Sequence, residues 1–181
     1  MARSIFSNAV RVPGPAAVAA LVMLLASPLP SLAESPMTKQ HIAFGSGHFV
    51  VTADPTVERY KLIVGEIPGK CKPELKVEEK DAHLSIVRAN SECRDEIYAT
   101  FQINPAWAQE LDLSLKAGQL DLSPSLIEAA KRIDAKVRVG DIVGRDGVER
   151  AWVVGAKFTL THEQPGLTIN TSVSAGQITF L

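Results

Sequence analysis

The chain has 181 residues, of which 46% are hydrophobic and 22% are charged, and its formal net charge is −1. This composition excludes a disordered tail and a coiled coil. The nearly balanced charge argues against electrostatic capture of nucleic acid, which needs a concentrated basic face. The sequence therefore predicts a globular protein with no nucleic-acid partner.

The first 33 residues are typical of a signal peptide. Arg3 and Arg11 form a basic start, 16–26 is an apolar run, and 31–33 places small residues at −3 and −1 of a cleavage site. The apolar run is too short for a stable membrane span, although an uncleaved anchor remains the alternative. Cleavage leaves one domain over 34–181 with a formal charge of −3, because the removed segment contains two arginines and no acid.

The two cysteines, Cys71 and Cys93, both lie in the exported part of the chain. Residues 75–79 and 83–87 alternate in polarity around the polar break at 80–81, which indicates a β-hairpin. Such a hairpin brings both cysteines to its open end, and an oxidising compartment favours their pairing. We therefore expect a Cys71–Cys93 disulfide, with two buried thiols as the alternative.

Further strands are predicted on both sides of this hairpin. The segments 41–53, 60–64 and 97–103 are apolar or alternating, and Asn104-Pro105 ends the last of them. The cluster Gly45-Ser46-Gly47-His48 is the nearest approach to a local catalytic motif, and we interpret it as a flexible loop.

A loose repeat occupies the chain from Leu111 onward. Ala-Gly-Gln-Leu-Asp-Leu at 117–122 returns as Ala-Gly-Gln-Ile-Thr-Phe at 175–180, with weaker copies between them. An alternating strand, a glycine and a second strand describe one bent rung, because glycine tolerates positive φ and close approach of the next rung. Stacked rungs would bury a shared apolar column. The predicted rung glycines are Gly118, Gly140, Gly155 and Gly176, and the predicted inward residues include Leu113, Leu115, Leu120, Val137, Val139, Ile142, Ile169, Val173 and Ile178.

One helix is expected within the repeat region, over 123–132. Ser123 is a suitable cap, Pro124 follows it, and basic residues stand at the end. This helix would cap or cover the stack.

The order of these elements resembles a known family. A strand ending in Ile103-Asn104-Pro105, followed by rungs at Gly118, Gly140 and Gly176, is similar to a bacterial adhesin-like family of short exported β-solenoid or β-roll domains. The resemblance covers 41–181 and is specific over 97–181. It implies a mainly β fold with a short β-solenoid or β-roll-like stack, and it carries no catalytic residues to transfer. The few rung copies, the one short helix expected before Gly140 and the expected disulfide depart from the family pattern.

The chain contains no recognisable catalytic or metal-binding motif. The four histidines have no metal-ligand spacing, and no Gly-x-Ser-x-Gly elbow exists. Most acids alternate along amphipathic strands, where solvated faces account for them. We therefore expect no enzyme activity, no metal and no cofactor.

The sequence leaves two functional hypotheses. The first is a non-enzymatic envelope module, periplasmic or else secreted or at the cell surface, that presents a solenoid face to a protein or polymer partner. The second is a small outer-membrane β-barrel, prompted by the alternation of 173–181. The candidate binding residues for the first are four charged residues around a tryptophan, a pairing enriched at binding hot spots, and a solvated turn is the alternative there. They are Arg145, Asp146, Glu149, Arg150 and Trp152.

Overall fold

The protein is described by a computed structural model that covers residues 37–66, 70–89, 92–93, 95–144 and 155–181. This part of the chain is mainly β, as the sequence predicts. None of its helices is long and apolar enough to cross a membrane. In chain order the elements are β1 (Met37–Ala53), β2 (Tyr60–Val64), β3 (Leu75–Lys80), β4 (His83–Arg88), β5 (Tyr98–Ile103), β6 (Ala108–Leu122), α1 (Pro124–Ala129), β7 (Ala130–Val143), β8 (Ala156–Thr161) and β9 (Leu167–Phe180).

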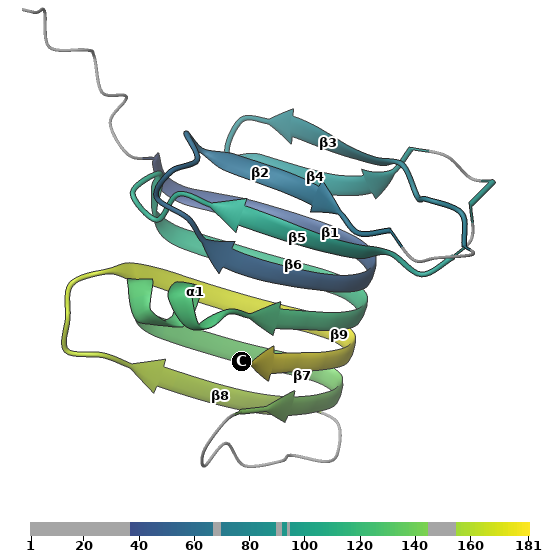
Figure 1. Ribbon diagram of the computed structural model, residues 1–181. Coiled ribbons are helices and arrows are strands. Elements are labelled where there is room, and N and C mark those ends of the chain that lie inside the picture. The colour runs from purple at the N-terminus through teal and green to yellow at the C-terminus, as the bar shows by residue number, and fades with distance from the viewer. Residues whose placement is uncertain (1–36, 67–69, 90–91, 94, 145–154) are drawn as a thin grey trace, which may run out of the picture. The chain divides into compact units, whose positions relative to one another are not determined.

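The strands form one mixed sheet that does not close on itself (Figure 1). Its main path runs β2-β5-β1-β6-β9-β7-β8, and the β3–β4 hairpin joins it through β1. The interior neighbours β1, β6, β9 and β7 are mutually parallel, whereas β2 and β8 are antiparallel to their neighbours at the two ends. The sheet therefore has a parallel centre with antiparallel ends.

Each of the four interior strands bends at a glycine, and the bends lie on the same side of the sheet (Figure 1). All four glycines have positive φ, between 119° and 151°. A Cβ at Gly118 would lie 2.0 Å from the carbonyl oxygen of Gly47, and one at Gly176 would lie 1.8 Å from that of Gly118. Glycine is thus required for the backbone conformation and for the approach of the next strand. We call this row the glycine ladder; in spatial order it consists of Gly47, Gly118, Gly176 and Gly140.

Two sequence-based interpretations of glycines need correction. Gly47 belongs to the ladder, so the segment interpreted as a flexible loop is the bend of β1. Gly155 was predicted as a rung glycine but lies outside the ladder, immediately before β8. It has positive φ, yet a Cβ there would meet nothing within 4 Å. The reason is that β8 starts beside the bend of β7 and runs back along only one half of it.

The bend divides each interior strand into a first arm, before the glycine, and a second arm after it. The inner faces of the two arms pack against each other, as the ring centroids of Phe44 and Phe49 show at 4.7 Å across the bend of β1. Residues three before and two after each glycine are buried, Leu115 and Leu120 among them. Val139 was predicted to face inward but is 53% exposed, because the residue directly before a bend glycine points outward. The other predicted inward residues are buried.

Helix α1 is shorter than predicted and closes the open side between the arms. Ser123 caps it by accepting a hydrogen bond from the backbone N–H of Leu126 at 3.3 Å. Leu126 is buried, and the helix contacts β1, β7 and β9. The predicted helical residues 130–132 are extended instead, because Ala130 and Arg132 already pair with β9.

The β3–β4 hairpin and the disulfide were both predicted, and both are present. The hairpin closes with Lys80 opposite His83, and Asp81 between them has φ 54°. Cys71 and Cys93 are joined, with their Cα atoms 5.8 Å apart.

The disulfide lies where the glycine ladder ends. Strand β4 pairs with the first arm of β1 and β5 with its second arm, so the two together take the place of one bent strand. Their connection carries Cys93, and the connection from β2 to β3 carries Cys71. The disulfide therefore joins the β2–β3 connection to the β4–β5 connection.

Candidate functional site

A row of polar side chains crosses the outward face of the first arms. Its members come from six neighbouring strands and lie directly opposite one another in the strand register. We call it the polar row; from β4 to β8 it consists of His83, His41, Asp112, Asn170, Asp134 and Thr159.

The polar row lines a hollow of about 570 Å³, which we call the trough. Neighbouring strands are separated by about 4.8 Å, so five intervals give the trough a length of about 24 Å across the strands. Other side chains beside the row complete its lining; they include Lys39, Ser114, Ser172, Lys136 and Lys157.

Asp112 is held at the centre of a hydrogen-bonded group near the β1 end of the trough. Its carboxylate accepts from Lys39 Nζ at 2.9 Å and Asn170 Nδ2 at 2.8 Å, and its Oδ2 lies 3.0 Å from His41 Nδ1. Burial raises the pKa of Asp112, but the bonds from Asn170 and Lys39 and the nearby positive charge outweigh burial and leave that pKa below its usual value. Lys39 and Asn170 also donate to Glu110, each at 2.8 Å. The Asp112 carboxylate is therefore ionised at neutral pH, and both carboxylates at this end are already hydrogen-bonded.

Asp134, near the β8 end of the trough, also accepts hydrogen bonds from neighbouring side chains. Arg132 donates to both of its oxygens, at 2.6 and 3.1 Å, and Thr159 Oγ1 donates at 2.7 Å. The bonds from Arg132 and Thr159 hold the pKa of Asp134 below its usual value.

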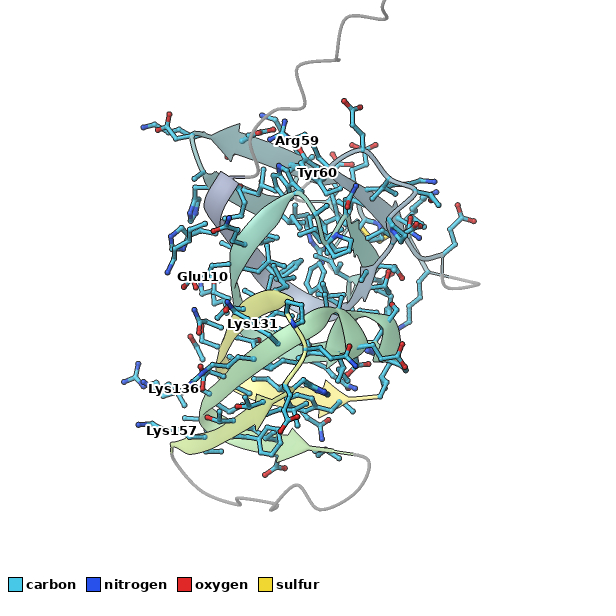
Figure 2. The ribbon with its side chains drawn as sticks, turned by 90° about the vertical axis from the view of Figure 1, so that its left-hand side faces the viewer. Arg59, Tyr60, Glu110, Lys131, Lys136 and Lys157 are labelled. Carbon is cyan, nitrogen blue, oxygen red and sulfur yellow. A yellow bond between two sulfur atoms is a disulfide. The ribbon has the colours of Figure 1, made fainter. Side chains whose placement is uncertain are left out.

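Lys136 and Lys157 carry charge that the trough does not balance. They lie directly opposite each other on β7 and β8, and both are exposed. Figure 2 shows both side chains projecting from the sheet on the same side. Among the described residues neither has a carboxylate within ion-pair distance. Like charges on directly opposite residues destabilise a sheet, so this pair lowers the stability of the fold.

A second polar cluster lies on the outward face of the second arms. His48 Nε2 lies 2.6 Å from Asp121 Oδ2, and Gln119 Nε2 donates to Asp121 Oδ1 at 2.8 Å. The Asp121 side chain is only 6% exposed. In the described part of the chain this cluster is thus a hydrogen-bonded histidine–carboxylate pair supported by Gln119.

One group in the described residues brings potential metal ligands together, and it consists of Cys71, Cys93 and Asp95. Both cysteines are in the disulfide, so their sulfur atoms are not thiolate ligands.

The binding residues predicted from sequence, Arg145, Asp146, Glu149, Arg150 and Trp152, all lie outside the described residues. The polar row was missed, although the sequence contains a signal for it. The row members on the four interior strands each stand six residues before a ladder glycine; they are His41, Asp112, Asn170 and Asp134. Aligning the segments on their glycines, with Gly47 included, would have placed these four side chains together.

Comparison with known proteins identifies no family for the chain. No family model matches it, and no curated protein matches it. A crystal structure of a protein from Clostridium sporogenes, provisionally described as a cell adhesion protein, aligns with a TM-score of 0.36 at 13% sequence identity. The alignment covers 81% of this chain and 92% of that chain. A likeness at this level assigns no function, so any functional proposal depends on the site itself.

Proposed function

We propose that the protein is a non-enzymatic, exported module of the bacterial envelope that binds a protein or polymer partner through the trough. The observation that carries this proposal is the polar row, six side chains in register across six strands. Solvation alone needs polar side chains on an outward face, but it needs neither a hollow of about 570 Å³ nor two unbalanced lysines at its end. Both features favour a ligand.

The proposal includes a short β-solenoid or β-roll as the scaffold. Support comes from the parallel stacking of β1, β6, β9 and β7 with their bends in register. Such a stack presents its outward side chains as straight rows, which suits an extended partner.

Export has two kinds of support. The N-terminal 33 residues have the basic start, apolar run and small-residue site of a signal peptide. The disulfide is stable in an oxidising compartment such as the periplasm, and thiols stay reduced in the cytosol. The periplasm and the cell surface both satisfy these conditions.

The trough can be blocked with a matched control on the same strand. Ser172 and Ser174 are both exposed residues of β9, but only Ser172 lines the trough. Protein produced from the full-length sequence is incubated with isolated bacterial cell-wall and outer-membrane fractions, and cosedimentation is measured. We expect the wild type and Ser174→Tyr to cosediment and Ser172→Tyr to remain in the supernatant, with similar thermal midpoints for all three.

Equal cosedimentation of the two tyrosine variants would remove the trough from the proposal. Absence of binding by the wild type to every fraction would contradict the proposal as a whole.

A further inference from the structure

The charges lining the trough leave a surplus at one end. Lys39 is bonded to two carboxylates, Glu110 and Asp112, and Arg132 is bonded to Asp134, so these bonded groups together have a net charge of −1, located near the β1 end. Lys136 and Lys157 have no such partner among the described residues. The unpaired positive charge of the trough therefore lies over β7 and β8, where it exceeds the one surplus carboxylate at the β1 end.

The position of the trough excludes one common kind of peptide recognition. An extended peptide binds a sheet by adding a strand to an open edge, where main-chain groups are unpaired. The trough crosses β1, β6, β9 and β7, which have a paired strand on both sides. A peptide lying there would find no main-chain partners for its own N–H and C=O groups, whose burial without partners is costly.

The described lining of the trough presents no exposed large hydrophobic side chain of the kind that inserts into a membrane, although Leu113, Ala135 and Phe158 contribute to it. Among the described residues, the exposed large hydrophobic side chains are Ile63, Val87, Val139 and Leu181, and none of them lines the trough. Its floor offers short hydroxyl and amide side chains instead, from Ser114, Ser172 and Asn170. Such groups hydrogen-bond to hydroxyls, so the lining is complementary to a chain rich in hydroxyls that also carries negative charge.

We propose that the trough binds an acidic polysaccharide along its length, with sugar carboxylates against Lys136 and Lys157 and sugar hydroxyls along the polar row. This inference rests on the proposed function and names the class of its partner. The ammonium groups act as exposed point charges, so binding weakens as salt is added.

Polygalacturonate is the probe, and its methyl-esterified form is the control ligand, because the backbone is the same but the carboxylate charge is removed. The test variant is the double substitution Lys136→Gln and Lys157→Gln. The control variant is Lys131→Gln, an exposed lysine of β7 that does not line the trough. Affinities are measured by titration calorimetry at low and at physiological salt.

We expect the double variant to bind polygalacturonate about 3- to 30-fold more weakly, since each of two exposed charge pairs contributes up to about a fivefold change. The Lys131→Gln protein should bind within about twofold of the wild type, and the methyl ester should bind weakly to every protein. Unchanged affinity in the double variant, or equal binding of the ester, would overturn the inference.

Two further ligands test the assignment to polysaccharide. If poly-glutamate binds as tightly as polygalacturonate, the site recognises charge alone and the polysaccharide class is wrong. If vesicles containing anionic lipid bind as tightly, a membrane surface is the better assignment. Failure here is separable from failure of the proposed function: Ser172-dependent cosedimentation with an envelope fraction, together with no binding of polygalacturonate, refutes only the present inference.

Discussion

The glycine ladder makes a quantitative prediction about Gly118. Replacing it with alanine puts a Cβ at φ 119°, where a side chain is strained by about 1–3 kcal/mol. The new Cβ would also lie 2.0 Å from the carbonyl oxygen of Gly47, whereas Cβ contacts under 3.0 Å essentially never occur. The neighbouring strand must therefore move by about 1 Å or more, and Gly47 lies between Ile97 and Gly118.

Such a shift sacrifices one or two interstrand hydrogen bonds, each with a net contribution of about 0.5–1.5 kcal/mol. Together with the strain at φ, the expected loss in the free energy of unfolding is about 2–6 kcal/mol, a large part of the 5–15 kcal/mol that is usual for a domain.

Alanine substitutions at two other glycines distinguish the contribution of backbone strain from that of close strand approach. Gly155 has φ 97° with open space around it, so Gly155→Ala should lose only the strain, about 1–3 kcal/mol. At Gly45 the nearest atom to a new Cβ would be 3.6 Å away and φ is not positive, so Gly45→Ala should change stability by less than about 1 kcal/mol. Urea unfolding followed by far-UV circular dichroism gives all three values. If Gly118→Ala is no less stable than Gly155→Ala, close strand approach is not what requires glycine at the bends.

Three further predictions follow from the disulfide, the trough carboxylates and the N-terminus. Replacing Cys71 or Cys93 with serine should lower the free energy of unfolding by about 3 kcal/mol, since the disulfide closes a loop of about 23 residues; free thiols in the purified exported wild type would contradict the bond. The pKa of Asp112 is lower in the folded than in the unfolded protein, so its contribution to stability is complete above about pH 4 and is lost as the pH falls through the lowered value. Below pH 4, the urea midpoint should therefore decrease less steeply with falling pH in Asp112→Asn than in the wild type. Equal slopes in the two proteins would count against this role. Intact-mass spectrometry of the exported protein should find Glu34 as its first residue, and a retained N-terminus would refute cleavage there.

Local sequence was sufficient to predict the bends at Gly118, Gly140 and Gly176. Gly47 was missed because its neighbours Gly45 and Ser46 have the composition of a loop. Its flanking spacing is nonetheless that of the other bends, with an apolar residue three before and two after the glycine. Position relative to the glycine was thus more informative than the composition of the segment.

The order of the strands was not accessible in the same way. Any two of the four bent strands can align their glycines, so the pattern specifies register but not which strand lies beside which. The hydrogen bonds within the trough depend on that choice. Asp112 contacts Lys39 only because β1 lies next to β6, and it contacts Asn170 only because β9 lies on the other side of β6. The site therefore emerges from long-range pairing, which single-sequence patterns do not encode.

The placement of β9 between β6 and β7 has a consequence for how the chain reaches its native state. Strands β6 and β7 are consecutive β-strands in the sequence, yet they share no hydrogen bonds with each other and are bridged by a strand that is synthesised after both. Until β9 docks, each of the two presents an open parallel edge, and such edges recruit strands from other molecules. Pairing over such distances along the chain is slow, which prolongs the exposure. Truncation or delayed docking of β9 should therefore cause aggregation of the whole domain rather than loss of one peripheral strand.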